Sequence, residues 1–370
     1  MITSTSTVTT TEQPAVDLQT IRHVLSVFVP MAGSAAIQCV RGGLSGSAVF
    51  VCEVAGRKFA MKRWPAGTLP WRIDEVHEVM AQSSRSLSIV PELVRSSLAS
   101  TRVGYEGFQY ELVSWMDGEA VADSADELQR AISLIPDSAV DTAGPSRRIL
   151  AAVEAGGEAI ARFHDSVRRI SGPMTPAPSV LRRLGRIEQL RVELPQALKR
   201  AETLSPVLRG AAKWLQRESA SRLDAAHHVL GQWVGRMVPT QMVLRDVHRQ
   251  HILFREAAVT GLVDFDAVGV DTVATDLARW VADFAEKPAD FRILVDTAVA
   301  GYQRFAPISA CESELASAIC EASAIILLAN WVVWASLGQQ NFSGCNDLVD
   351  RRVAELLRRM GATETMASAR

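Results

Sequence analysis

Residues able to do chemistry gather in one short region, where an aspartate and two histidines stand within "VLRDVHRQHILF", residues 243–254. Asp246 is followed by His248 and His251, and a further aspartate, Asp264, stands in "GLVDFD". An aspartate can accept a proton or hold a hard cation, and an imidazole can accept a proton or bind a transition metal. The pattern predicts a general-base site or a metal site, and a core or loop-bracing role is the alternative.

Two short apolar runs flank a polar turn in "HILFREAAVTGLVDFD", which predicts a β-hairpin. Asp246 precedes this hairpin and Asp264 follows it, so the hairpin would bring the two carboxylates close together. The alternative is that both carboxylates cap loops or pair with Arg245 and Arg249.

The elements around this hairpin belong to a chain of 370 residues, 48% of them hydrophobic, which is enough for two lobes or domains. The 39 basic and 41 acidic side chains leave a formal net charge of −2, which favours neither nucleic acid nor an anionic membrane surface as a partner. Five cysteines occur without a C-x-x-C pair, which argues against a disulfide framework or a structural zinc site. We expect a cytoplasmic protein, and its oligomeric state stays open.

Neither the polar N-terminal stretch nor the most apolar stretch of the sequence has the pattern of a targeting signal or a membrane span. Residues 1–18 are rich in serine and threonine and lack a signal-peptide pattern, so we expect a disordered tail. The most apolar stretch, Ala324–Gly338, is shorter than the roughly 20 residues that cross a bilayer and contains Asn330. It predicts a buried helix.

Strand-like patterns dominate from about residue 38 to 115. The runs "SAVFVCEV" and "RKFAMKRW" predict a hairpin, and "GFQYELVSW" predicts a further strand. Between them, "WRIDEVHEVMAQ" predicts one helix with its apolar side chains on one face, namely Ile73, Val76, Val79 and Met80. From Gly118 to Pro145 we expect a loop, and beyond it the pattern is mainly helical. The fold class is therefore α+β.

The spacing of Asp246, position 251 and Asp264 resembles the catalytic loop and metal-binding aspartate of the aminoglycoside phosphotransferase and choline kinase superfamily. "GGLSGSAVFVCEV" resembles the family's nucleotide loop, "FAMKRWP" its lysine strand and "YELVSWMDGE" its hinge. "GEAIARFHDSV" and "VDTVATDLARW" resemble two later family segments, so that about residues 38–340 match in the right order.

The resemblance implies a protein-kinase-like fold with a small, mainly β lobe at 19–116 and a larger, mainly helical lobe at 117–370 that carries the catalytic loop 244–266. It also implies an ATP-dependent transfer of the γ-phosphate to a hydroxyl of a small molecule that is aminoglycoside-, amino alcohol- or sugar-like. The cofactors would be ATP and Mg²⁺, with Mn²⁺ as the alternative ion, and GTP in place of ATP stays open.

By the same resemblance, Asp246 is the base that orients the acceptor hydroxyl and Asp264 is a magnesium ligand. Lys62 would hold the α and β phosphates, oriented by Glu75 or Glu78, of which we favour Glu78. Strand alternation turns Lys62 away from Met61.

The nucleotide would also contact two further sets of residues. Backbone N–H groups of a small-residue loop can approach phosphates closely, and here they come from Gly42, Gly43, Ser45, Gly46 and Ser47. The resemblance places the adenine against Val113 and the backbone of Ser114 and Met116. An ordinary turn and an ordinary strand end are the alternatives for these two segments.

Two departures from the family pattern affect the site. Leu244 and Arg245 replace the usual histidine and glycine before the aspartate, and His251 replaces an asparagine that is a second metal ligand. A neutral imidazole suits manganese and other transition metals better than magnesium. His251 therefore either binds a softer ion or leaves a one-metal site and hydrogen-bonds to Asp246. The departure also favours an alternative, a pseudokinase-like nucleotide- or ligand-binding protein. A helical interaction protein with accidental motifs is a third reading.

Other polar residues have simpler explanations. Asp276 resembles the family's structural aspartate, and capping a helix N-terminus is the simpler account. His248 is expected to brace the loop. A solvated loop is the simpler explanation of an acidic stretch that could also attract a cationic acceptor. Its members are Asp117, Glu119, Asp123, Asp126 and Glu127.

Overall fold

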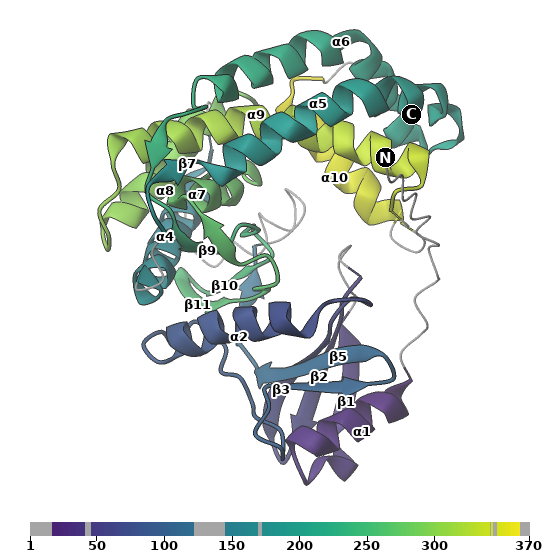
Figure 1. Ribbon diagram of the computed structural model, residues 1–370, viewed down its shortest axis with the longest axis vertical. Helices are drawn as coiled ribbons and strands as arrows, with labels where there is room; N and C mark the ends of the chain where they lie inside the picture. Colours follow the sequence, from purple (N-terminus) through teal and green to yellow (C-terminus); the bar gives the residue numbers. More distant parts are fainter. Residues whose placement is uncertain are drawn as a thin grey trace, which may run out of the picture. The chain divides into compact units, whose positions relative to one another are not determined.

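A computed structural model describes residues 17–40, 46–121, 145–168, 172–340, 342 and 346–362 (Figure 1). The chain divides into two compact units. The first falls within Met1–Asp74, Leu93–Trp115 and Gln340–Ser343, and the second within Glu75–Glu92, Met116–Gln339 and Gly344–Arg370. The first unit is mainly a β-sheet and the second mainly helical, so the predicted α+β class is confirmed.

An antiparallel five-stranded sheet forms the first unit, in the order β1-β2-β3-β5-β4. Its strands are β1 (Ala36–Val40), β2 (Ala48–Val54), β3 (Arg57–Arg63), β4 (Arg102–Tyr105) and β5 (Phe108–Ser114). The predicted hairpin is the pair β2 and β3, joined through Ala55 and Gly56. Both joining residues have positive φ, 49° and 76°, as a two-residue turn that follows the strand twist requires.

Helix α1 (Leu18–Phe28) packs its apolar face on this sheet, followed by a short 3₁₀ helix, η1 (Ala32–Ser34). Its buried residues are Ile21, Val24, Leu25 and Phe28, which join Phe50, Cys52, Met61 and Leu112 in one core. The Asp17 side chain accepts a hydrogen bond from the backbone N–H of Gln19 and so caps α1. Placing Asp17 and Leu18 in a disordered tail was therefore wrong, because they cap and begin this helix. Residues 1–16 lie outside the described part.

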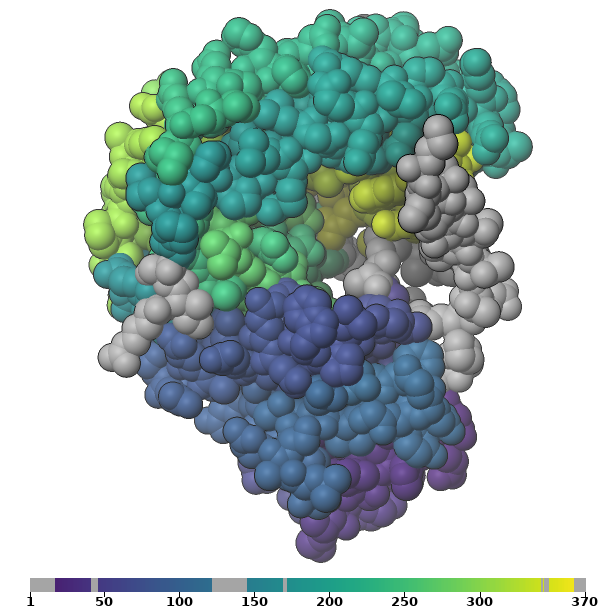
Figure 2. Space-filling model, in the orientation of Figure 1, coloured from purple at the N-terminus to yellow at the C-terminus, as the bar shows by residue number. Residues whose placement is uncertain are grey.

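The helices that lie wholly or mainly in the second unit begin with α2 (Pro70–Ser84), which buries Ile73, Val76, Val79 and Met80 as predicted. The others are α4 (Arg147–Ser166), α5 (Pro178–Lys199), η4 (Ala201–Thr203), α6 (Pro206–Gly231), α7 (Val273–Ala282), α8 (Asp290–Gln303), α9 (Ala310–Leu337) and α10 (Asn346–Arg359). Helices α5 and α6 lie side by side (Figures 1 and 2).

Helix α9 is the centre of the second unit and contacts α5, α6, α7, α8 and α10. It is 28 residues long and contains nearly all of the apolar stretch Ala324–Gly338, so the predicted buried helix is confirmed. A capping box between Ser309 and Glu312 begins it, and Gly338 ends it at a φ of 64°. By length and composition α9 could cross a membrane, but 78% of its most apolar window is buried inside the protein.

Short strands of the second unit hold the candidate site. They are β6 (Glu119–Ala120), β7 (Thr175–Pro176), β8 (Met237–Val238), β9 (Gln241–Val243), β10 (Ile252–Arg255), β11 (Ala258–Leu262) and β12 (Gly269–Asp271). Strands β10 and β11 form the second predicted hairpin, and β9 pairs with β12. The loop 244–251 runs from β9 to β10, and Asp264 follows β11. Pairing of these strands fixes where both loops begin and end.

Candidate active site

A buried aspartate on α7 anchors the start of the loop 244–251. The Asp276 carboxylate accepts hydrogen bonds from the backbone N–H of Leu244 (2.7 Å) and of Arg245 (2.6 Å). Its Oδ2 also lies 3.0 Å from Nε2 of His164, whose other ring nitrogen lies 3.1 Å from the Tyr302 hydroxyl. Asp276 is fully buried, so these partners replace the water that its oxygen atoms lose on burial.

Asp276 does not cap a helix, so that expectation was wrong. Thr272 is the N-cap of α7, and its hydroxyl accepts a hydrogen bond from the backbone N–H of Ala274. Asp276 lies in the first turn, with its side chain directed at the loop.

Two residues of the candidate site have strained backbones. Arg245, directly before Asp246, has a φ of 65°, and Asp264 has a φ of 62°. A residue other than glycine in this region costs on the order of 1–3 kcal/mol and persists only where the surroundings hold it. For Arg245 the holding contacts are its N–H bond to Asp276 and a guanidinium bond to the carbonyl of Ala267.

Replacing Asp276 by alanine is expected to free this loop. A buried N–H group, that of Leu244, and a partly buried one, that of Arg245, would lose their acceptor, which costs about 1–3 kcal/mol for a buried group. We expect a lower midpoint in urea unfolding and faster hydrogen exchange at Leu244 and Arg245. Asp276→Asn keeps one acceptor oxygen. Its urea midpoint and its exchange rates at these two amides should therefore lie between those of the wild type and those of the alanine variant. An alanine variant with unchanged exchange at both amides would show that Asp276 does not hold the loop.

Asp246 is partly exposed and ion-paired. Its Oδ1 lies 3.0 Å from Nε of Arg279 on α7, and its side chain is 48% exposed. Burial alone would raise the pKa of Asp246, but the charge of Arg279 and its hydrogen bond hold the pKa below its usual range. Asp246 is therefore ionised at neutral pH, as a proton acceptor must be.

The predicted alternative partners of Asp246 bind elsewhere, which corrects the pairing with Arg245 and Arg249. Arg249 forms a buried ion pair with Glu355 on α10, at 2.8 Å. Arg245 donates from Nε to the carbonyl of Ala267. Sequence reasoning missed Arg279, which is 33 residues from Asp246 and gave no signal beyond its place in "TDLARW".

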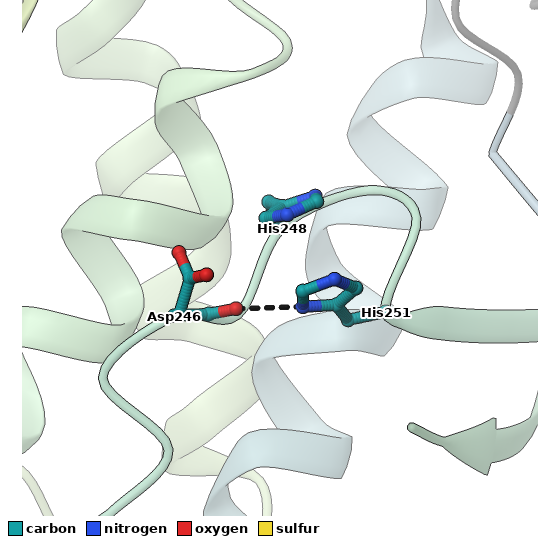
Figure 3. Close-up of side chains that lie close together, drawn as sticks. All are labelled: Asp246, His248 and His251. Atoms are coloured by element: carbon teal, nitrogen blue, oxygen red, sulfur yellow. Dashed lines mark hydrogen bonds between the residues drawn. The ribbon is translucent and has the colours of Figure 1, made fainter. Parts of the chain in front are cut away.

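His251 lies between the two aspartates. Its Nδ1 is 2.7 Å from the backbone carbonyl of Asp246 (Figure 3), and its Nε2 is 3.5 Å from Oδ2 of Asp264. Because a carbonyl can only accept, Nδ1 carries a proton, and Nε2 is the ring nitrogen that faces Asp264. One imidazole therefore contacts the backbone of Asp246 and faces the carboxylate of Asp264, while the closeness of the two carboxylates stays a prediction.

His248 packs on His251, with ring centroids 3.7 Å apart and an interplanar angle of 36° (Figure 3). Its Nδ1 lies 3.7 Å from Oδ2 of Asp283, just beyond the end of α7. Burial, with repulsion from His251, lowers the pKa of His248 to about 3, so the ring is neutral. Burial would raise the pKa of Asp283, but Arg359 and Arg279 lower it, so this carboxylate is ionised.

In the first unit, Lys62 shares its face of the sheet with a carboxylate. Lys62 on β3 pairs with Glu111 on β5, and its Nζ lies 5.1 Å from the centre of the Trp64 ring. Nε1 of Trp64 donates to Glu111 at 2.7 Å. Met61 points into the core, as alternation predicted. Glu111 carries no local signal in the sequence, since only the register of β3 against β5 places it opposite Lys62.

The other predicted nucleotide residues are partly described. Gly46, with a φ of 77°, and Ser47 come directly before β2. Val113 and Ser114 end β5, and Met116 follows the strand. Gly42, Gly43 and Ser45 lie outside the described residues, as do Asp123, Asp126 and Glu127 of the acidic stretch. Asp117 is exposed and pairs with Arg255 at 3.5 Å, and Glu119, Glu75 and Glu78 are exposed.

This arrangement can be compared with known proteins. The sequence profile of the phosphotransferase enzyme family matches residues 36–308, about three quarters of the chain. The chain belongs to this family. The phosphotransferase is also 31% identical over 117 residues to a homoserine kinase from Acidiphilium cryptum, a match that covers 31% of the chain and 35% of that kinase. It thus matches only about a third of the length of this curated relative.

Solved structures show that the phosphotransferase has a kinase-like fold. An aminoglycoside phosphotransferase from Alicyclobacillus acidocaldarius is 14% identical with a TM-score of 0.59, covering 97% of this chain and 96% of that one. A spectinomycin phosphotransferase in complex with ADP and spectinomycin is 10% identical with a TM-score of 0.60, covering 94% and 98%. A microcompartment-associated aminopropanol kinase is 13% identical with a TM-score of 0.60, covering 95% and 98%.

Proposed function

We propose that this phosphotransferase moves the γ-phosphate of ATP to a hydroxyl of a small molecule, with Asp246 as the base. The observation that carries the proposal is the ionised, partly exposed Asp246 carboxylate, oriented by Arg279 on a loop that Asp276 fixes. Asp246 would accept the proton of the acceptor hydroxyl as the new O–P bond forms and ADP leaves. Phosphoryl transfer depends mainly on positioning and charge neutralisation, which a strained loop held by buried hydrogen bonds supports.

The nucleotide would be held by the first unit and the hinge. Lys62 would contact the α and β phosphates, with Gly46 and Ser47 of the loop offering backbone N–H groups. Glu111 is opposite Lys62 in the sheet and would orient it, as an alternative to the predicted Glu75 and Glu78. Gly42, Gly43 and Ser45 complete the proposed phosphate loop, and Val113, Ser114 and Met116 the proposed adenine site.

Asp264 and His251 would hold the divalent ion, which supplies charge neutralisation of the phosphates when bound. Their ligand atoms lie 3.5 Å apart, close enough for both to contact one ion. Asp264 suits Mg²⁺, whereas the Nε2 lone pair of His251 suits Mn²⁺ better.

Replacing His251 by asparagine, the usual family residue, is expected to shift the metal preference toward Mg²⁺. An amide oxygen is a hard ligand, so the ratio of turnover with Mn²⁺ to turnover with Mg²⁺ should fall roughly tenfold. The ratio is measured in parallel at saturating ATP. A matched change at the exposed His227, His227→Asn, should leave it unaltered. An unchanged ratio in His251→Asn would remove the coordination role.

The acceptor would be a small hydroxyl compound in the cytoplasm. The named relatives act on or bind amino-bearing alcohols of different sizes, namely homoserine, aminopropanol and spectinomycin. The first experiment is therefore to incubate the full chain with ATP, Mg²⁺ or Mn²⁺ and each of these three compounds, and to follow phosphorylated product by phosphorus NMR. ADP that forms without any phosphorylated acceptor would mean that none of the three is the substrate.

A second candidate function is nucleotide or ligand binding without phosphoryl transfer. The observation that favours it is His251 itself, which replaces a metal-binding amide with a bulkier ring that is hydrogen-bonded to the loop. This function predicts ATP binding without acceptor-dependent ADP formation, and His251→Asn would be the variant to restore transfer.

A further inference from the structure

Helix α10, drawn in yellow in Figure 1, carries buried charged side chains that reach the candidate site. Glu355 and Arg359 on this helix, Arg249 in the loop 244–251 and Asp283 at the end of α7 are each 9% exposed or less. Burying charged groups costs free energy, and a buried ion pair often stabilises a fold no better than apolar side chains of similar size. Four such groups at one place therefore favour a role in positioning.

The first link of α10 holds the far end of the loop. Nη2 of Arg249 donates to Oε1 of Glu355 at 2.8 Å. The backbone carbonyl of Arg249 also accepts a hydrogen bond from the N–H of Val121 at 3.1 Å. Asp276 fixes the backbone directly before Asp246, and Arg249 is held three residues beyond it. Asp246 thus lies between two anchors.

The second link of α10 holds the end of α7. The last carbonyl groups of a helix have no partner within the helix. Here Arg359 donates from Nη2 to the carbonyl of Asp283 and from Nε to that of Ala285, both at 3.1 Å. Its positive charge also suits the negative end of the helix dipole. Arg279 lies in the last turn of α7 and orients Asp246, so Arg359 supports the turn that carries this arginine.

The two links share side chains. Arg359 lies 3.5 Å from Oε2 of Glu355 through Nη2, and 3.5 Å from Oδ1 of Asp283 through Nη1. Nη1 of Arg352 lies 3.9 Å from the other oxygen of Asp283 and 3.9 Å from Oε2 of Glu355. Each carboxylate is therefore shared between guanidinium groups, which ties α10, the loop and the end of α7 into one network.

We propose that Glu355 and Arg359 are positioning residues for phosphoryl transfer, through which α10 holds Asp246 in place. Glu355 acts through Arg249, and Arg359 acts through Arg279 and the last turn of α7. A small misplacement of a reacting group lowers a rate strongly, so loss of either link should lower kcat and leave ATP binding intact. The effect on the rate rests on the proposed function, whereas the holding of the loop does not.

The first test is hydrogen exchange of the full chain, which needs no substrate. Glu355→Gln keeps the size of the side chain and removes its charge. Exchange should rise on the order of tenfold at the amide of His251, which donates to the carbonyl of His248 at 2.8 Å within the loop. The amide of Leu244, held by Asp276, should exchange as in the wild type. Unaltered exchange at His251, or a rise by the same factor at both amides, overturns the link.

The second test is a double-mutant cycle in kcat with Arg249→Met, Glu355→Gln and the double variant. Each single variant should lose roughly tenfold to a hundredfold in kcat with an ATP KM within about twofold of wild type, and the double variant should lose no more than the slower single one. Arg249→Lys keeps the charge and should recover part of the rate. The double variant leaves no unpaired charge from this pair, so it decides the test if a single variant does not fold.

Arg359→Met tests the second link and should lower kcat by a similar factor. Its matched control is Arg358→Met, because Arg358 is the neighbouring exposed arginine of α10. The control for Glu355→Gln is Glu158→Gln, which removes a carboxylate that pairs with Arg162 on α4. Both controls should match the wild type in hydrogen exchange and in turnover.

The kinetic results separate positioning from stability. All rates are measured well below the unfolding midpoint of each variant. Wild-type kcat in folded Glu355→Gln, or in the folded double variant, overturns the positioning role even where stability falls. A double variant whose loss equals the product of the two single losses would show that Arg249 and Glu355 act separately, and the first link would be wrong. Faster exchange at His251 in a protein that phosphorylates no acceptor supports the link and counts only against the proposed function.

Discussion

Replacing Asp246 by asparagine is expected to lower phosphoryl transfer by about 10²–10⁴-fold, because the amide cannot accept the proton of the acceptor hydroxyl. ATP affinity should stay nearly unchanged, since Asp246 is oriented by Arg279 and is assigned no contact with the nucleotide. Turnover is measured with a coupled ADP assay, and ATP affinity by calorimetry.

The matched control is Asp224→Asn, which removes an exposed carboxylate on α6 that pairs with Arg191. This variant should behave as wild type. Retained turnover in Asp246→Asn would mean that the proton goes to another group or to solvent, and the proposed base would be wrong.

Replacing Asp264 by asparagine is expected to remove the metal dependence of ATP binding. The carboxylate is the one hard anionic ligand in the proposed pair with His251. With Mg²⁺ or Mn²⁺ present, ATP affinity should fall on the order of tenfold or more, equivalent to about 1.4 kcal/mol. With chelator present, the variant and the wild type should bind ATP alike.

The control for this change is Asp165→Asn, because Asp165 is 45% exposed and pairs with Arg168 at the end of α4. Asp264 also sits at a φ of 62°, and asparagine tolerates this conformation well. A folding defect is therefore not expected. If the wild type binds ATP equally well with metal and with chelator, the result would favour a nucleotide-binding protein without phosphoryl transfer.

Local patterns in the sequence were sufficient to predict the secondary-structure elements around the site. Alternation of apolar and polar residues predicted the hairpins β2–β3 and β10–β11, and it predicted that Lys62 points away from Met61. These features depend on neighbours a few residues apart, and strand period and turn chemistry report on that range directly.

Contacts between distant segments could not be predicted in the same way. The bonds from Leu244 and Arg245 to Asp276 join residues about 30 positions apart, and the Asp246–Arg279 pair spans 33. No periodicity encodes them, so Asp276 was read as a cap, which is the commonest local role for an aspartate near a helix start. Glu111 was missed for a similar reason, because the register of β5 on β3 is a property of the folded sheet.

The start of helix α1 shows the limits of composition. Helix α1 follows a serine- and threonine-rich stretch, and Asp17 was grouped with that stretch although it is a strong N-cap residue. Helix α9, which was predicted to be helical and buried, carries polar residues that its own hydrogen bonds satisfy. Glu312 belongs to the capping box, and Ser323 bonds back to the carbonyl of Ile319.

The measurement that tests the central claim most directly is transfer of label from γ-labelled ATP to an acceptor. The full chain is incubated with Mg²⁺ or Mn²⁺ and the hydroxyl compounds named above, beside Asp246→Asn. Labelled, phosphorylated acceptor in the wild type, strongly reduced in the variant, is the predicted result. Equal labelling in both proteins, or no metal-dependent binding or consumption of ATP in the wild type, would contradict the account.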